Sequence, residues 1–434
     1  MLQPLTWPPR SAYLHIPFCH RRCYYCDFAV VPLGDRAGAE PGAPGSASIA
    51  AYLALLQREI ASAPPGPPLS TVYLGGGTPS LLLPGQVGGL LEALAGRYGL
   101  APGAEVTLEL DPASFDQSRL AAYLAAGVNR VSLGGQSFDD AVLAALGRRH
   151  RGADLVEAAG WLAQARHQGR LASWSLDLIQ AVPAQTTALW REQLHQAVAL
   201  GPPHLSVYDL SIEPGTVLAW REQRGELQLP DAELAADLME LTARVLGGSG
   251  YGHYEISNYA LPGHASRHNR MYWSGAGWWG FGLGATAAPW GQRLARPRTR
   301  EGYRQWLEQS ALLPAPSSGP NPAEWLEDQW IVGLRRREGV RPLELLTVAG
   351  LAPATAERAL ADLASRLEGF CRRGVLLLEG CRWRLSDPAG LALSNAVLRE
   401  CLLWWEHWRP DGAAGPANPA GPAPPGCDPA AAAG

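Results

Sequence analysis

Six short apolar segments recur between positions 11 and 259, and each is followed by a stretch long enough for a helix. The segments read AYLHI, TVYLGG, EVTLEL, RVSLGG, SWSLDLI and HLSVYDL, and each ends where polar residues or glycines begin. Branched and aromatic runs of this length are typical of buried strands. Between them, helices are expected at 49–63, 84–98, 118–126, 153–168, 187–200 and 231–246. Six strand-then-helix units in series predict an α/β fold with a parallel sheet, and so many units favour a full or partial barrel.

Changes in composition mark the expected domain boundaries. Residues 34–48 (GDRAGAEPGAPGSAS) are predicted to form a flexible insertion, because glycine, proline and small polar residues dominate them. The proline-rich stretch 312–324 separates a first domain, 1–311, from a smaller, mainly helical domain, 312–409. The tail 410–434 is low in complexity and cannot bury a core, so we expect it to be disordered.

Charge and hydropathy exclude some classes of function. The chain has 434 residues, 47% of them hydrophobic, and a formal net charge of −4. Its arginines are scattered, which does not favour a nucleic-acid or anionic-membrane surface. No apolar run reaches the roughly 18 residues that a membrane span needs, and the start MLQPLTWPPRSA lacks the apolar core of a signal peptide. We therefore expect a cytoplasmic protein without a transmembrane segment.

Three of the seven cysteines lie in the segment HIPFCHRRCYYCDF, whereas Cys371, Cys381, Cys401 and Cys427 are interpreted as ordinary thiols. In a reducing compartment, clustered cysteines bind metal or do redox chemistry more often than they form disulfides. Three thiolates cannot complete a tetrahedral zinc site, although His15 or His20 could be the fourth ligand. An iron–sulfur cluster held by three thiolates would instead leave one iron with an open position for a ligand.

Other polar residues follow the predicted strands at the ends that face the ligand crevice in such folds. GGGTP (75–79) follows the second strand, Glu109 ends the third, Gln136 follows the fourth and Asp177 lies in the fifth. Tyr208 and Asp209 end the sixth. Three successive glycines let a backbone approach a ligand closely and present N–H groups to it.

The cysteine spacing and the words around it resemble a known family. C-x3-C-x2-C with Tyr25 before the last cysteine resembles the signature of radical S-adenosylmethionine (SAM) enzymes. YLHIPFC, YLGGGTPS, RVSLGGQSF, HLSVYDLSIEPGT, HYEISNYA, HNRMYW and GLRRREGV, in this order over about residues 11 to 340, resemble the family of oxygen-independent coproporphyrinogen III oxidase and its relatives. The resemblance implies a partial (β/α)6 radical SAM barrel. It also implies a 4Fe-4S cluster on Cys19, Cys23 and Cys26 whose fourth iron is bound by SAM.

The same resemblance implies which residues contact SAM. The matching positions are Tyr13, Tyr25, Gly76, Gly77, Thr78, Glu109, Gln136, Arg148 and Asp177. Carboxylates, an amide and a guanidinium suit a ligand with an ammonium group, a carboxylate and a ribose diol. Two words depart from the family pattern. ELDP has aspartate where asparagine is usual, and LIQAVPAQT has Ala181 and Ala184 where glycines are usual, which restricts the loop after the fifth strand.

The family has two branches with different functions. The oxidase carries a further cysteine two positions after the third and a longer N-terminal segment, whereas this chain has Phe28 there and eighteen residues before Cys19. Both features are similar to the HemW-type haem chaperones, which pass haem to acceptor proteins. The segment HNRMYW matches the haem-binding motif of that branch at His268, Asn269, Tyr272 and Trp273. Met271 is a second candidate ligand.

The alternative is the oxidase itself. In that case a 5′-deoxyadenosyl radical would start the oxidative decarboxylation of coproporphyrinogen III, and a ferredoxin or flavodoxin would supply the electron. The C-terminal domain is expected to cover the open side of the barrel in either case. GFGLGA (280–285) superficially matches a nucleotide-binding fingerprint, but it does not open a strand–helix–strand unit, so we reject that interpretation.

Overall fold

The computed structural model describes residues 8–309 and 321–408. Its main sheet contains the six expected strands in parallel and in chain order. They are β1 (Ser11–Ile16), β4 (Leu69–Gly76), β5 (Leu100–Leu110), β6 (Arg130–Gln136), β7 (Ser173–Gln180) and β8 (His204–Asp209). The predicted parallel α/β architecture is confirmed.

Three short strands extend this sheet at its two ends. β11 (Trp279–Phe281) pairs in parallel with β1, and β10 (Asn258–Ala260) and β9 (Gly252–Glu255) continue from β8 in antiparallel pairing. In the strand order the outermost members are β11 and β9, which do not pair with each other within the described residues. The barrel is therefore partial. β11 covers the start of GFGLGA and is followed by β12 (Thr286–Ala287), not by a helix, which agrees with rejecting a nucleotide fingerprint.

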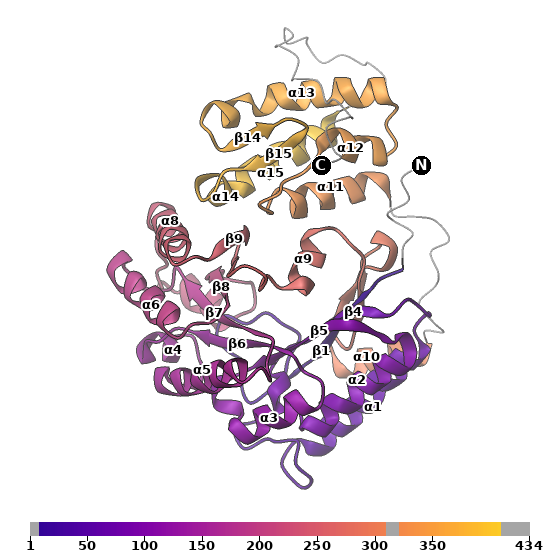
Figure 1. Cartoon of the computed structure of the whole chain (residues 1–434), viewed down its shortest axis with the longest axis vertical. Helices are drawn as coiled ribbons and strands as arrows, with labels where there is room; N and C mark the ends of the chain where they lie inside the picture. Colours follow the sequence, from indigo (N-terminus) through magenta and orange to yellow (C-terminus); the bar gives the residue numbers. More distant parts are fainter. Residues whose placement is uncertain (1–7, 310–320, 409–434) are drawn as a thin grey trace.

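Helices cover the outer face of the sheet (Figure 1). The expected helices are α1 (Ser46–Ser62), α2 (Pro84–Tyr98), α3 (Gln117–Ala125), α5 (Gly152–His167), α6 (Thr187–Ala199) and α8 (Ala232–Gly248), each within three residues of its predicted ends. Side-chain caps begin three of them, because Asp116, Thr186 and Asp231 accept the N–H of the third helical residue. Two further helices, α4 (Asp140–Ala145) and α7 (Val217–Gln223), were not predicted.

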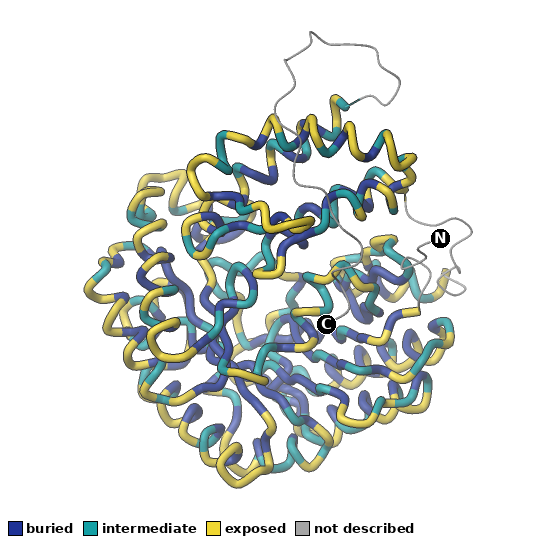
Figure 2. Tube along the Cα trace, turned by 45° about the horizontal axis from the view of Figure 1, so that its top comes forward, coloured by how far each residue is buried: buried dark blue, intermediate teal, exposed yellow. Residues whose placement is uncertain are grey.

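Burial follows these layers, with the strands buried and the outward faces of the helices exposed (Figure 2). Leu14, Leu74, Leu108 and Leu176 on four parallel strands are fully buried in one apolar cluster. The segment 34–48 forms hydrogen-bonded turns, for example from Gly38 N–H to Pro44 O at 3.1 Å, and its last residues begin α1. The predicted insertion is thus a compact turn ahead of a helix.

The C-terminal part is mainly helical, as expected. It contains α11 (Pro322–Gly333), α12 (Pro342–Val348), α13 (Pro353–Arg372), α14 (Ala389–Ala392), α15 (Ser394–His407) and one hairpin of β14 (Leu376–Glu379) and β15 (Arg382–Leu385). These elements bury an apolar cluster that includes Trp330, Leu363 and Trp404 and also contains Met239 of α8. Much of the predicted linker and the whole predicted disordered tail, 410–434, lie outside the described residues, so the domain division stays a prediction.

The helix α9 (Arg267–Trp273) lies between the sheet and α11 (Figure 1). Around it, the C-terminal part contacts the barrel through polar groups. His253 Nδ1 lies 2.7 Å from Asp387 Oδ1, and Ile256 N–H donates to the carbonyl of Arg335 at 3.1 Å. Among the described residues, no helix is long and apolar enough to cross a membrane. The remaining short elements are β2 (Phe18–Cys19), β3 (Val31–Pro32), β13 (Leu294–Ala295) and α10 (Arg300–Gln309).

Candidate functional site

A cavity of about 390 Å³ opens where the parallel strands end, and we call it the first cavity. All three clustered cysteines line it. So do eight of the nine residues expected to contact SAM: Tyr25, Gly76, Gly77, Thr78, Glu109, Gln136, Arg148 and Asp177. These side chains come from the loop after β1 and from β4, β5, β6 and β7 or the segments that follow them. The fold therefore gathers residues that are more than 150 positions apart in the chain.

The cysteine loop is held in place by backbone hydrogen bonds. Leu33 N–H donates to Cys19 O at 2.9 Å, Tyr24 N–H donates to Leu146 O at 3.0 Å, and Arg22 Nε donates to Cys26 O at 2.7 Å. Burial, together with the neighbouring thiols, raises the pKa of Cys19 to about 12. A buried thiol such as that of Cys19 becomes a thiolate readily only beside a strong positive charge, which a metal centre provides.

The donor set fits a cluster better than zinc. Both ring nitrogens of His15 are engaged, since Nδ1 lies 2.9 Å from the hydroxyl of Tyr13 and Nε2 lies 2.9 Å from the carbonyl of Ala29. His15 is thus removed as a fourth zinc ligand, whereas His20 lines the cavity. In the described part of the chain, no three His, Cys, Asp or Glu side chains converge around a single ion. A cubane places each thiolate on a different iron, so its ligands lie farther apart than those of one zinc ion.

The glycine turn after β4 is packed tightly against the loop after β1. Gly76 has φ 118°, and a Cβ on it would lie 2.6 Å from the His15 ring. A Cβ on Gly77 would lie 2.6 Å from the carbonyl oxygen of Phe18. Gly77 N–H donates to Ile16 O at 2.8 Å and Thr78 N–H to Phe18 O at 2.7 Å. The expectation that this turn presents its N–H groups to a ligand is therefore wrong for these two residues, because the neighbouring backbone already uses those donors.

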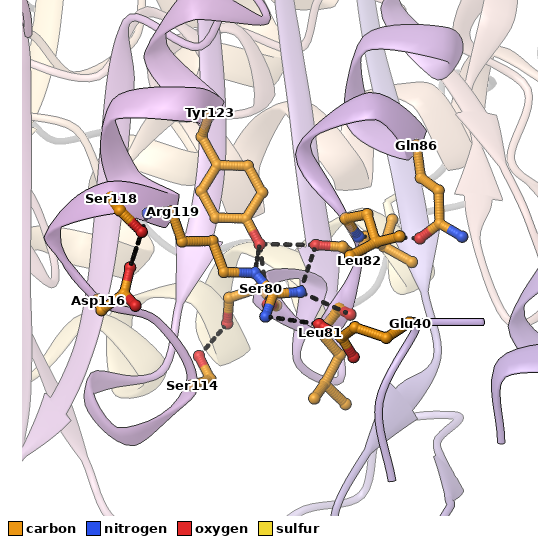
Figure 3. A network of polar contacts seen from close by, with 11 residues as sticks. Glu40, Ser80, Leu81, Leu82, Gln86, Ser114, Asp116, Ser118, Arg119 and Tyr123 are labelled. Atoms are coloured by element: carbon orange, nitrogen blue, oxygen red, sulfur yellow. Dashed lines mark hydrogen bonds and ion pairs between the residues drawn. The ribbon is translucent and has the colours of Figure 1, made fainter. Parts of the chain in front are cut away.

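A network of polar contacts fixes the next residues of this turn (Figure 3). Tyr123 donates its hydroxyl to the carbonyls of Ser80, at 2.9 Å, and Leu82, at 2.6 Å. Arg119, on the same helix α3, donates to the carbonyl of Leu82 at 3.2 Å and to the Tyr123 hydroxyl at 3.1 Å. The Ser80 hydroxyl in turn accepts the N–H of Asp111 at 3.2 Å. The turn after β4 and the turn after β5 are thus tied together directly behind the cavity.

Glu109 and Asp177 place two carboxyl groups at the cavity. Glu109 accepts the Gly76 N–H at 3.0 Å and the Tyr73 hydroxyl at 2.8 Å. Burial raises the pKa of Glu109 to about 7, and the nearby Asp177 adds to this effect. Asp177 accepts hydroxyls from Ser132, at 2.7 Å, and Ser175, at 3.1 Å, while burial raises its pKa as well. Carboxyl groups with strongly shifted pKa values in a cavity are typical of functional sites.

Arg148 lies between a carboxylate and a thiol. Its Nη2 donates to Asp111 Oδ2 at 2.7 Å and to the carbonyl of Gly134 at 2.8 Å, and its Nη1 lies 3.7 Å from Cys23 Sγ. Gln136 beside it has φ 64°, a left-handed conformation that is rare for a residue with a side chain. Strain of this kind occurs most often at functional sites, where the surrounding structure holds it.

Two other sequence expectations turned out differently. Tyr13 does not line the first cavity, because its hydroxyl contacts His15 and its ring stacks on Tyr73 at 6.2 Å. Ala181 and Ala184 were expected to restrict the loop after β7. They nevertheless adopt the left-handed conformation, with φ 58° and 59°. Gln185 supports this loop by accepting the N–H of Ala181 at 2.7 Å.

A second cavity of about 460 Å³ lies between α9 and α11. Three residues of the HNRMYW word line it, namely Asn269, Tyr272 and Trp273, together with Trp278 and Trp325. Tyr208 at the end of β8 lines both cavities, and its side chain is 42% exposed. The sequence placed Tyr208 at a strand end but offered no sign that two cavities meet there.

His268 does not line this second cavity. It is 1% exposed, and its Nδ1 lies 2.7 Å from the Thr71 hydroxyl while its Nε2 lies 3.0 Å from the Tyr272 hydroxyl. Its ring stacks on Tyr73 at 5.1 Å. Burial, assisted by the positive charge of Arg130, lowers the pKa of His268 to about 3. Both ring nitrogens of His268 are thus hydrogen-bonded, so neither is free to bind haem iron in this arrangement, and a ligand role for His268 or Met271 stays a prediction.

Sequence reasoning missed two residues of the site. Asp111 was noted only as a departure from a family motif, and because it lies 37 positions before Arg148, no signal in the sequence indicated their ion pair. Tyr73, which bonds Glu109 and stacks on both Tyr13 and His268, lies in a strand that reads as wholly structural. Tyr73 lies two positions before Gly75 on the same strand, so both face the same side of the sheet as the glycine turn. This shared face was the signal in the sequence.

Comparisons with known proteins agree with this geometry. The Radical SAM superfamily model matches residues 13–174. A protein named heme chaperone HemW from Synechocystis is 40% identical over 402 residues, which cover 90% of this chain and 95% of that protein. A protein with the same name from Escherichia coli is 38% identical, over 68% of this chain and 74% of its own length.

A solved structure described as coproporphyrinogen III oxidase (HemN) from Escherichia coli, a radical SAM enzyme, superposes with a TM-score of 0.74 at 22% identity. It covers 93% of this chain and 92% of its own, which establishes a shared fold. The HemW proteins from Synechocystis and Escherichia coli match this chain over most of their lengths at identities well above this level. The chain described here therefore belongs to the HemW family within the radical SAM superfamily.

Proposed function

We propose that this protein is a haem chaperone, which binds haem and transfers it to an acceptor protein in the cytoplasm. The observation that carries the proposal is the second cavity, which is lined by aromatic residues of the HNRMYW motif and α11 and shares the lining residue Tyr208 with the first cavity. Its volume of about 460 Å³ lies within the range of cavities that hold small molecules and cofactors. Flat aromatic walls suit a flat macrocycle.

In this proposal, Cys19, Cys23 and Cys26 hold a 4Fe-4S cluster and the first cavity holds SAM. The carboxyl groups of Glu109 and Asp177 suit the ammonium and ribose hydroxyls of SAM, and Arg148 suits its carboxylate. The N–H groups of Gly77 and Thr78 in the turn after β4 already donate to backbone carbonyls. That turn would therefore contact SAM through its own carbonyl oxygens, which would accept hydrogen bonds from the ligand. Loaded with both groups, the site has one-electron reductive chemistry available, and a ferredoxin or flavodoxin would be the electron donor.

Iron and acid-labile sulfide, measured on protein purified without oxygen, test the cluster. We expect both in the wild-type protein and neither in Cys23→Ala, while Cys371→Ala, which removes a thiol outside the loop, retains them. Zinc in place of iron would contradict the proposed cluster.

Haem binding tests the second part of the proposal. Titration with haem is expected to give saturable binding to the wild-type protein and weaker binding to Tyr272→Ala and His268→Ala. Equal binding by all three proteins would remove the role proposed for the HNRMYW word. Incubation with coproporphyrinogen III, SAM and a reductant without oxygen is expected to give no protoporphyrinogen, and its formation would favour the oxidase instead.

A further inference from the structure

The second cavity contains an arginine that has no ion-pair partner within the described part of the chain. Arg335, from the word GLRRREGV, lines the cavity at the end of α11, and its Nη2 donates to Asn395 Oδ1 at 2.8 Å. Its Nε is buried without a hydrogen-bond partner, and no carboxylate among residues 8–309 and 321–408 lies within ion-pair distance of it. Burial lowers the pKa of Arg335, which is the signature of a guanidinium that lacks a compensating charge.

The other charged groups of the cavity are engaged. Arg293 donates two hydrogen bonds, at 3.1 and 2.9 Å, to the carboxylate of Asp328. Glu255 accepts from the side chain of Asn258, and burial raises its pKa to about 7, so its negative charge is weakened. Arg335 is thus the cationic group whose charge is not neutralised by a neighbour among the described residues that line the cavity.

A second buried polar atom in the cavity lacks a partner among the residues that the structure describes, and because it is an amide oxygen it needs a donor such as a water molecule rather than a carboxylate. Asn258 is 3% exposed and lines the second cavity, and its side-chain oxygen has no hydrogen-bond partner within the described residues. Buried polar atoms without partners are rare, because each costs free energy unless a ligand or water satisfies it. The cavity therefore combines aromatic walls with an uncompensated guanidinium and an unsatisfied amide.

Resting on the proposed function, we infer that Arg335 binds a propionate carboxylate of the haem, with the macrocycle lying against the aromatic walls formed by Tyr272, Trp273 and Trp325. A guanidinium matches a carboxylate in a bidentate geometry, and such charge-assisted hydrogen bonds are about twice as strong as neutral ones. The arginine lies two positions after the last residue of α11, and its backbone carbonyl accepts the N–H of Ile256 of the barrel. The C-terminal part would therefore select a carboxylated tetrapyrrole through one residue anchored on both sides of the cavity.

Haem and haem dimethyl ester, whose propionates are esterified, test this inference with the full chain. Arg335→Gln is expected to bind haem roughly tenfold more weakly than the wild type while binding the ester equally well. Arg335→Lys keeps the positive charge but loses the bidentate hydrogen-bonding geometry of the guanidinium. Its haem affinity is expected to lie between those of the wild type and Arg335→Gln. Arg337→Gln is the matched control, because Arg337 is exposed and does not line the cavity.

Two results would overturn the inference while leaving the proposed function in place. One is equal haem affinity of Arg335→Gln and the wild type. The other is an equal loss for haem and its ester, which would mean that Arg335 acts only on the shape of the cavity. Absence of saturable haem binding by the wild type would instead refute the proposed function, and the inference with it.

Discussion

Arg148 and Asp111 form an ion pair at 2.7 Å that joins the segment after β6 to the end of β5, directly beside Cys23. Both side chains are mostly buried, at 12% and 22% exposure. Burial alone would raise the pKa of Asp111, but Arg148 and His150 hold it well below its usual range. The aspartate of the ELDP motif therefore orients the arginine whose guanidinium contacts the Cys23 thiol.

Asp111→Asn is expected to destabilise the protein by about 3 kcal/mol at neutral pH, because it leaves Arg148 without its buried partner. The folded-state pKa of Asp111 is depressed, so the stability from this pair is fully present above about pH 4 and is lost as the pH falls further. Thermal unfolding at pH 7 and pH 3.5 measures both effects. We expect the difference between variant and wild type to shrink at pH 3.5.

Asp35→Asn is the matched control, since Asp35 pairs with Arg21 at the surface at 3.0 Å. Exposed pairs contribute little, so this variant should unfold within about 1 kcal/mol of the wild type. Equal effects of the two substitutions would show that the buried Asp111–Arg148 pair contributes no more to the free energy of unfolding than an exposed pair.

Ala184→Gly is expected to stabilise the protein by about 0.5–1 kcal/mol. Ala184 is exposed and adopts φ 59°, a conformation that costs an alanine about 1–2 kcal/mol, part of which the greater flexibility of unfolded glycine offsets. Ala236→Gly, at an exposed position inside α8, should change stability by a similar amount in the opposite direction. If both substitutions destabilise, the loop after β7 does not carry this strain in solution.

SAM affinity is expected to rise as the pH increases through about 7, because Glu109 must lose a proton before it can attract an ammonium group. The raised pKa also affects stability. Glu109 holds a proton in the folded state between about pH 4.5 and 7 but loses it in the unfolded state, so the free energy of unfolding of the apoprotein falls as the pH rises over that range. Calorimetric titration with SAM of protein carrying its reconstituted cluster, from pH 6 to pH 8, measures the affinity. Glu109→Gln should bind SAM more weakly and without this pH dependence, and a pH dependence unchanged in the variant would assign the proton to another group.

His268→Ala is expected to lower the stability of the protein as well as its haem affinity. The substitution removes hydrogen bonds to Thr71 and Tyr272 and a ring stacked on Tyr73, which together are worth about 2–3 kcal/mol. Thermal unfolding without haem measures this loss. Asn269→Ala, the next residue on the cavity side of α9, should leave the unfolding temperature nearly unchanged. An unchanged unfolding temperature for His268→Ala, with an altered haem spectrum, would support an axial ligand instead.

Much of the fold was predictable because its signals are local. A run of branched and aromatic residues that ends in glycine marks a buried strand, and the alternation of six such runs with helical segments requires a parallel sheet. The three cysteines likewise share one short loop, so their spacing, together with the family resemblance, favoured a cluster with an open position over a zinc site or inert thiols.

What remained undecided involves groups that meet only across the sheet. The sequence placed Asp111 and Arg148 in separate words, His268 in a word for haem, and Arg335 in a run of three arginines. Tertiary structure decided that Asp111 pairs with Arg148, that Thr71 and Tyr272 occupy the nitrogens of His268, and that one of the three arginines lines a cavity beside Trp325. Local periodicity predicts which elements form, but hydrogen bonds and burial between distant segments determine which polar atoms remain available to a ligand.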